Sequence, residues 1–147
     1  MAVITSDILL EGVHRDIVFA WLGDPANTRR LLEGAFDGVV DQGPTDWEVT
    51  LKISPKARVM GLRFLGPDDS HGGRRILIDA SGKRTTGKVS YSLRTMKPSA
   101  NTLVTVHMDY DPGSVLGALI DRAGLQARLD QGWKATLDNL GRLIPRA

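Results

Sequence analysis

Residues Gly12–Gly34 read GVHRDIVFAWLGDPANTRRLLEG, and this stretch constrains the fold more than any other. Its apolar run predicts a short helix over Arg15–Leu22. Asp24 then offers an N-cap and Pro25 suits the first helical position, so a second helix is predicted up to about Glu33. Two helices this short cannot form a core by themselves. We therefore expect them to close one end of a larger element and to form the floor of a pocket.

The larger element is predicted to be an antiparallel sheet. Val3–Glu11 has strand character, and turn residues separate a series of further strand candidates after Gly34. These candidates are Phe36–Asp41, Trp47–Ile53, Arg58–Leu65, Arg75–Ala80, Thr86–Thr95 and Thr102–Tyr110. In several of them apolar and polar residues alternate, which is typical of a sheet with one solvated face and one covered face.

A long C-terminal helix is the predicted cover of this sheet. An apolar stripe with helical spacing consists of Leu129, Trp133, Leu137, Leu140 and Ile144. At 1.5 Å per residue, a helix of roughly 30 residues is ~45 Å long, enough to cross a curved sheet. The element order thus predicts one α+β domain over residues 1–147. It would have about seven antiparallel strands, two short helices after the first strand and one long final helix.

Composition and charge exclude several classes of protein. The chain has 147 residues, of which 41% are hydrophobic and 24% charged, as in a globular protein with its own core. The 19 basic and 17 acidic residues are interleaved and aromatic residues make up only 5%, so a nucleic-acid partner is not expected.

Location is predicted from the same sequence. No apolar run approaches the ~20 residues of a membrane span, so we expect no stable membrane insertion. The first residues lack the basic segment and apolar core of a signal peptide. Zero cysteines exclude disulfides and thiol catalysis, and they fit a cytoplasmic protein.

The layout resembles the START/Bet v 1-like (SRPBCC) superfamily over essentially the whole chain. The resemblance is carried by the motif VHRDIVFAWLGDP at Val13–Pro25 and by the long helix over Leu116–Ile144. Within the superfamily the chain is most similar to the polyketide cyclase/dehydrase-like branch and to the branch that resembles the G-type accessory protein of carbon monoxide dehydrogenase. The stretch DPGSVLG at Asp111–Gly117 is similar to the latter. The chain departs from the family in having His14 where many members have proline, and in lacking a Pro-Gly pair around Gly34.

This resemblance implies a helix-grip fold around a hydrophobic cavity. Such a cavity would take lipids, polyketides, sterols or other apolar ligands, with catalysis in only some branches. The residues expected to line it lie on the covered phase of the strands and on the helical stripe. They are Trp47, Val49, Val89, Tyr91, Leu93, Val106, Met108, Tyr110, Leu129, Trp133 and Leu137.

Arg122 and Gln126 continue the line of Leu129 toward the start of the long helix, and they are the polar candidates for this site. As a hypothesis, they mark the polar end of the cavity and bind a carboxylate, carbonyl or hydroxyl group of the ligand. The alternative is a kink or rotation near Gly124. In that case the apolar face of the first turns consists of Leu116, Leu119 and Ala123.

Signals of catalysis and of bound cofactors are weak. His14, His71 and His107 lie in three separate predicted elements, which does not suit a metal site, and His107 falls on the solvated phase of its strand. The sequence has no nucleophile elbow, phosphate-binding loop or dinucleotide-binding fingerprint. We therefore expect no cofactor. Tyr91 and Tyr110 are the best acid–base candidates, with hydrogen-bonded core tyrosines as the alternative.

Three classes of function remain. The favoured one is a binding or carrier module for a small hydrophobic ligand in an internal cavity. The alternatives are an enzyme of the polyketide cyclase/dehydratase type and an accessory protein that docks a larger enzyme. The sequence leaves a homo-oligomer or a protein partner open.

Overall fold

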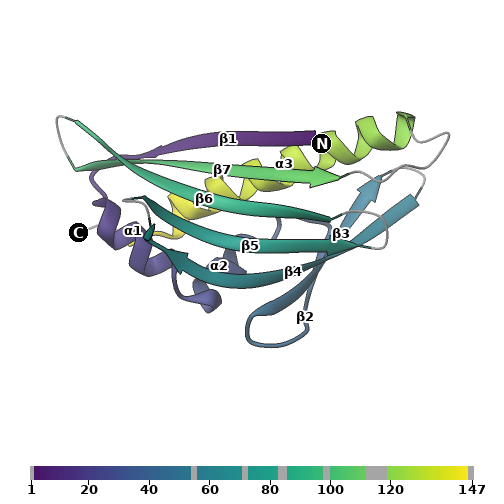
Figure 1. Ribbon diagram of the computed structural model, residues 1–147, viewed down its shortest axis with the longest axis horizontal. Coiled ribbons are helices and arrows are strands. Elements are labelled where there is room, and N and C mark those ends of the chain that lie inside the picture. Colours follow the sequence, from purple (N-terminus) through teal and green to yellow (C-terminus); the bar gives the residue numbers. More distant parts are fainter. Residues whose placement is uncertain are drawn as a thin grey trace.

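The computed structural model describes residues 2–53, 56–70, 73–82, 86–97, 100–111 and 119–145. The elements in these ranges are, in chain order, β1 (Ala2–Leu10), α1 (Arg15–Leu22), α2 (Pro25–Leu31), β2 (Gly38–Asp41), β3 (Asp46–Ile53), β4 (Lys56–Asp68), β5 (Arg74–Gly82), β6 (Thr86–Met96), β7 (Asn101–Asp111) and α3 (Leu119–Leu143). This order confirms the predicted α+β helix-grip architecture (Figure 1).

The strands form a seven-stranded sheet in the order β1-β7-β6-β5-β4-β3-β2, with every neighbouring pair antiparallel. Strand β4 is longer than the predicted strand Arg58–Leu65, because it begins at Lys56 and continues to Asp68. The register with β5 shifts between Phe64 and Gly66, and Gly66 has a φ of 112°. Leu65 is thus the extra residue of a β-bulge and is 52% exposed. Glycine at the next position lets the strand continue through the bulge.

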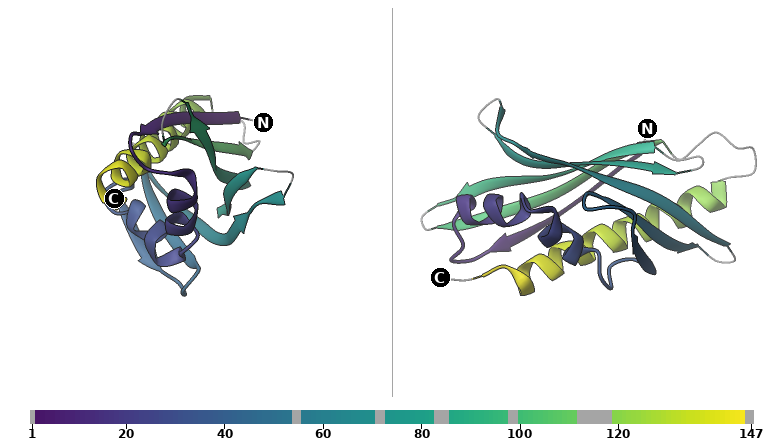
Figure 2. Two further views of the ribbon diagram at one scale, coloured as in Figure 1. Left: turned by 90° about the vertical axis from the view of Figure 1, so that its left-hand side faces the viewer. Right: turned by 90° about the horizontal axis from the view of Figure 1, so that it is seen from below.

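Helix α3 bridges the two sides of the curled sheet. It lies against β1 and β7 on one side, against β3 on the other, and against α2. Figure 2 shows the sheet curling around this helix. The middle strands stand farther from the helix backbone than these rims. Tyr91 of β6 reaches α3 through its side chain, which contacts Thr136 and Trp133.

Helices α1 and α2 lie at the end of the sheet near the C-terminus (Figures 1 and 2). Asp24 caps α2 as predicted, since its Oδ1 accepts a hydrogen bond from the Ala26 N–H at 3.0 Å. His14 caps α1 in the same way, since its Nδ1 accepts a hydrogen bond from the Asp16 N–H at 3.1 Å. Helix α2 ends at Leu31, slightly earlier than predicted.

Side-chain bonds hold this end together. Thr28 is buried and donates from Oγ1 to the Leu22 carbonyl oxygen at 2.6 Å, which joins α2 to α1. The Asn139 amide donates to the Leu31 carbonyl oxygen at 2.9 Å, which joins α3 to α2. The two short helices therefore close one end of the interior, as the opening stretch of the sequence predicted.

Candidate functional site

The apolar residues predicted to line a cavity all lie in the interior between the sheet and α3. Each is buried, with an exposed fraction of 5% or less. The set is Trp47, Val49, Val89, Tyr91, Leu93, Val106, Met108, Tyr110, Leu129, Trp133 and Leu137. Alternate residues of β3, β6 and β7 supply the sheet side, because successive side chains of a strand point to opposite faces.

Trp133 is the centre of the aromatic packing in this interior. Its ring meets Phe36 edge-on, with centroids 5.2 Å apart and planes at 78°. Tyr91 meets it in a similar way at 6.4 Å and 74°. The indole N–H donates to Sδ of Met108 at 3.2 Å, a weak acceptor for a buried donor. Phe36 was missed as a site residue, because a single aromatic residue after α2 carries no periodic signal.

The two interior tyrosines differ in hydrogen bonding. The Tyr91 hydroxyl lies 2.8 Å from Oγ1 of Thr136, which in turn donates to the Trp133 carbonyl oxygen at 2.6 Å. Because the single hydroxyl hydrogen of Thr136 is used in that bond, Tyr91 must donate its own proton to Thr136. Burial raises the pKa of Tyr91 well above its usual value, and the bond to Thr136 partly opposes this shift. Thr136 was not predicted, although it lies three residues after Trp133 on the same helical face.

Tyr110 is also shielded from solvent, at 1% exposed, but its hydroxyl has no hydrogen-bond partner within the described part of the chain. Burial raises the pKa of this hydroxyl too. The residue opposite it on β6 is Gly87. A Cβ atom there would lie 3.0 Å from Cβ of Tyr110 and 3.1 Å from Cε of Met108, so only glycine fits without a shift.

Of the polar pair predicted at the start of α3, the structure describes the side chain of Gln126 alone. Gln126 is exposed, in a shallow pocket of about 490 Å³ between the outer side of α3 and β1. The residue of this turn that faces the sheet is Leu125, 1% exposed and four residues before Leu129. The apolar stripe of α3 therefore continues from Leu129 to Leu125, four residues earlier, and not to Gln126, three residues earlier. This corrects the predicted placement of Gln126. The side chain of Arg122 lies outside the described residues.

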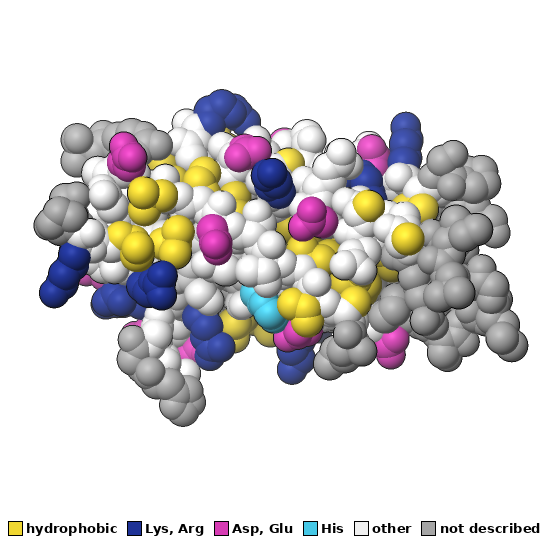
Figure 3. Space-filling view, turned by 90° about the horizontal axis from the view of Figure 1, so that it is seen from above, with side chains coloured by type: hydrophobic (Ala, Val, Ile, Leu, Met, Phe, Trp, Pro, Cys, Tyr) yellow, Lys and Arg dark blue, Asp and Glu magenta, His cyan; other side chains and the backbone are white. Residues whose placement is uncertain are grey.

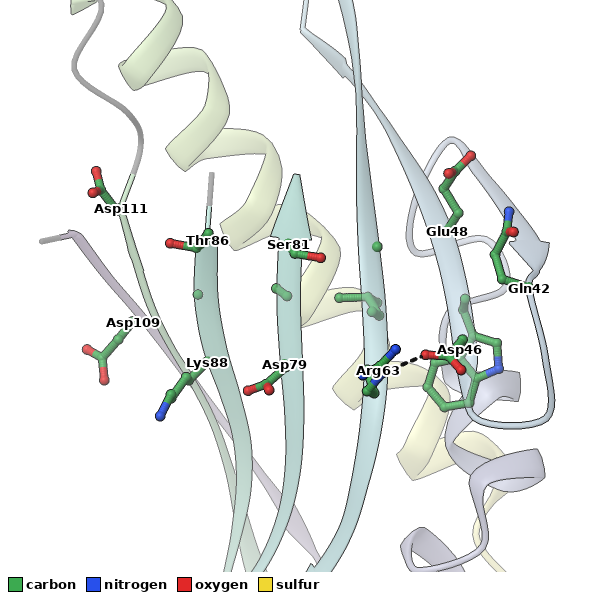
Figure 4. Close-up of a pocket in the computed structure, with 15 residues that line it drawn as sticks. Gln42, Asp46, Glu48, Arg63, Asp79, Ser81, Thr86, Lys88, Asp109 and Asp111 are labelled. Atoms are coloured by element: carbon green, nitrogen blue, oxygen red, sulfur yellow. Dashed lines mark hydrogen bonds and ion pairs between the residues drawn. The ribbon is translucent and has the colours of Figure 1, made fainter. Parts of the chain in front are cut away.

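The larger pocket is an open groove of about 1110 Å³ on the outer face of the sheet. Its charged side chains alternate along the strands with buried residues such as Trp47 and Leu62, which also line the groove, and α3 lies behind the sheet (Figure 4). A row of charged residues of alternating sign crosses five strands there, formed by Asp46, Arg63, Asp79, Lys88 and Asp109. Such cross-strand pairs stabilise a sheet, and Arg63 binds Asp46 at 2.9 Å. Both pockets thus lie outside the interior, where a ligand cavity stays a prediction.

The remaining features predicted from the sequence concern the histidines, the surface charges, metal binding and the membrane. His107 lies on the outer face, where Nδ1 contacts Oγ1 of Thr5 at 3.1 Å and Nε2 contacts Asp109 at 3.2 Å. His71 lies outside the described residues.

On the face above β1, basic and acidic side chains are interspersed (Figure 3). Among the described residues no group of three or more histidine, aspartate or glutamate side chains is arranged to hold a metal ion. No helix in the described ranges is long and apolar enough to cross a membrane.

Comparison with solved structures places this architecture among known folds. A START superfamily protein from Mycobacterium smegmatis aligns with a TM-score of 0.57 at 12% identity, over 94% of this chain and 98% of that one. The Zhui aromatase/cyclase from Streptomyces sp. R1128 aligns with a TM-score of 0.60 at 9% identity, over 98% and 96%. A norcoclaurine synthase mutant from Thalictrum flavum aligns with a TM-score of 0.55 at 17% identity, over 94% and 95%.

No protein-family model matches the sequence, and no curated protein matches it either. The structural likeness spans nearly the full length of each chain at identities too low to carry more than the fold. The chain has the START/Bet v 1-like helix-grip fold.

Proposed function

We propose that this START/Bet v 1-like domain is a binding or carrier module for a small hydrophobic ligand held between the sheet and α3. The observation that carries the proposal is the arrangement of α3, which rests on β1, β7 and β3 and faces the middle strands across a mostly apolar and aromatic set of side chains. Ligand sites of small molecules are mostly apolar and carry few polar groups, and this interior has that composition.

The chemistry of the interior supports binding over turnover. Its polar side-chain groups in the described part include the hydroxyls of Tyr91, Tyr110 and Thr136 and the indole N–H of Trp133. General acid–base catalysis works best with groups whose pKa lies near the working pH, and burial moves both tyrosine pKa values away from it. Two structural neighbours are named as a cyclase and a synthase. For this chain we propose retention of an apolar molecule.

Methyl-resolved NMR with a neutral apolar probe, 1-N-phenylnaphthylamine, tests the site directly. The aromatic probe should shift the methyl signals of Val49, Val106 and Leu129, which are buried in the interior. The matched controls are Val40 and Val59, which are 56% and 48% exposed on the outer face and should not move. Mass spectrometry of molecules retained by the purified protein then identifies the natural ligand class.

Two results would contradict the proposal. One is a probe that shifts only the exposed methyl groups, because it would then bind an outer surface. The other is the absence of any saturable shift up to the solubility limit of the probe, because the interior would then be closed to ligands.

A further inference from the structure

The unpaired hydroxyl of Tyr110 needs an explanation. Nearly all buried polar groups in proteins have a hydrogen-bond partner, because leaving one unpaired costs free energy. The Tyr110 oxygen is buried without one in the described part of the chain, although phenylalanine would fill the same volume at no such cost. A polar atom kept in an apolar interior at this cost indicates a partner that binds there.

The surroundings of Tyr110 indicate which kind of partner fits. Tyr110 and Met108 emerge from the same face of β7, two residues apart, so roughly 7 Å of strand separates them. The indole N–H of Trp133 points at Sδ of Met108, a thioether that accepts hydrogen bonds only weakly. Gly87 leaves the neighbouring position on β6 without a side chain. Met108 therefore neighbours two residues with poorly satisfied donors, Trp133 through its hydrogen bond and Tyr110 along the strand.

Tyr91 provides the contrast. Its proton is already donated to Thr136, whose own proton goes to the Trp133 carbonyl oxygen. Tyr91 can therefore offer no hydrogen to a ligand without breaking this chain of bonds. Of the two interior tyrosines, Tyr110 is the one whose donor has no acceptor among the described residues.

We propose that Tyr110 is the specificity-determining residue of the interior site, and that its hydroxyl donates a hydrogen bond to an acceptor oxygen of the ligand. The ligand class is then an apolar skeleton that carries a carbonyl oxygen, such as an aliphatic or aromatic ketone, and not a pure hydrocarbon. This inference rests on the proposed function, since it names the ligand chemistry of the same site.

The test compares two probes of nearly the same shape, 2-acetylnaphthalene and 2-ethylnaphthalene. Their affinities are measured by displacement of 1-N-phenylnaphthylamine from the parent protein, Tyr110→Phe and Tyr91→Phe. Tyr110→Phe should lower the affinity ratio of the acetyl to the ethyl probe by about two- to tenfold, the contribution of one hydrogen bond. Tyr91→Phe should leave the ratio at its parent value. Because both probes are measured on each variant, a general loss of packing cancels in the ratio.

The outcomes separate the two proposals. If both probes displace the fluorophore and Tyr110→Phe keeps the parent ratio, Tyr110 does not select the ligand and this inference is overturned, while interior binding stands. If Tyr91→Phe lowers the ratio as much as Tyr110→Phe, the assignment to Tyr110 is equally overturned. If neither probe nor the fluorophore binds the parent protein, the proposed function fails and this inference fails with it.

Discussion

At the scale of single residues, Tyr91 and Tyr110 show how similar positions in a strand pattern lead to different chemistry. Both lie on the covered face of adjacent strands and both are buried. Tyr91 meets a hydroxyl on α3, whereas Tyr110 lies against apolar groups and the backbone of a glycine. The first is therefore part of the core, and we propose that the second is available to a ligand.

This difference predicts opposite effects on stability in the absence of ligand. Tyr91→Phe should lower the free energy of unfolding by about 1 kcal/mol, because the buried Oγ1 of Thr136 loses its donor. Tyr110→Phe should leave it unchanged or raise it, because an unpaired hydroxyl is removed from an apolar site. Urea denaturation of the three proteins measures both changes. Equal losses in the two variants would show that Tyr110 has a partner after all.

A second residue-scale prediction concerns Asp37, which lies in the segment after α2 and binds both β3 and α3. Its Oδ2 accepts from the Lys52 N–H at 2.7 Å and from Nε of Arg128 at 2.9 Å. These bonds lower the pKa of Asp37, with the backbone bond from Lys52 as the largest cause. A lowered pKa means that this stabilisation is present above the unfolded value of about 3.9 and is lost as the pH falls through the folded value.

Asp37→Asn should therefore destabilise the protein at pH 7 by about 1 kcal/mol, a modest value because the pair is partly solvated. The difference in free energy of unfolding between this variant and the parent should shrink as the pH is lowered below about 4. Urea unfolding at a series of pH values measures it. Asp138→Asn, at an exposed position of α3, is the control and should change stability little at pH 7. A gap for Asp37→Asn that stays constant down to about pH 2 would contradict the assignment.

At the scale of elements, the glycines of α3 have a role that their spacing does not reveal. Each costs about 1 kcal/mol in a helix interior relative to alanine. A Cβ at Gly132 would overlap the ring of Phe36, which itself packs on Trp133. A Cβ at Gly141 would lie 3.0 Å from Cδ1 of Ile8 and 3.9 Å from Cδ2 of Leu10, the ends of two flexible side chains. Close packing of α3, and not flexibility, explains Gly132.

Gly132→Ala should lower the free energy of unfolding by about 1–3 kcal/mol, because Phe36 and Trp133 must move to admit the methyl group. Gly141→Ala is the matched control in the same helix. It should be neutral or stabilising, since the end of Ile8 can shift and alanine favours the helix. Thermal unfolding followed by circular dichroism compares the two. A stabilised Gly132→Ala variant would mean that the close approach is absent in solution.

At the scale of the whole molecule, α3 completes the core that the sheet cannot form by itself. Leu129, Trp133, Leu137 and Leu140 are each 0–1% exposed. Burial of such side chains contributes about 1.5–3 kcal/mol each, so together they match the roughly 5–15 kcal/mol by which a domain is stable. The curled sheet without them would expose its apolar face.

A chain that ends at Gly124 should therefore lose its cooperative unfolding transition and either aggregate or bind hydrophobic dyes. Circular dichroism in urea and analytical size exclusion measure this. A soluble truncated protein with a cooperative transition would show that the sheet and the two short helices fold without the part of α3 from Leu125 onward.

The sequence by itself determined the order of the elements and most of the inward-facing residues. Strand and helix periodicities are local properties, so Trp47, Val106 and Trp133 could be assigned to the interior from spacing alone. The N-cap at Asp24 and the helix start at Pro25 are equally local signals. The full length of β4 could not be predicted from local signals. Pairing with β5 extends this strand past Gly66 and Pro67, and a β-bulge makes the extension possible.

Only the tertiary structure decided the chemistry of the site. Steps of three and four residues both follow a helix face, so spacing alone could not choose Leu125 over Gln126, and packing against the sheet did. Whether a tyrosine is satisfied depends on groups far along the chain, as Thr136 is 45 residues from Tyr91. Tyr110 has no such group in the described part of the chain. A hydrogen bond depends on the positions of two atoms in space. The periodicity of the sequence therefore cannot predict which buried hydroxyl has a partner and which has none.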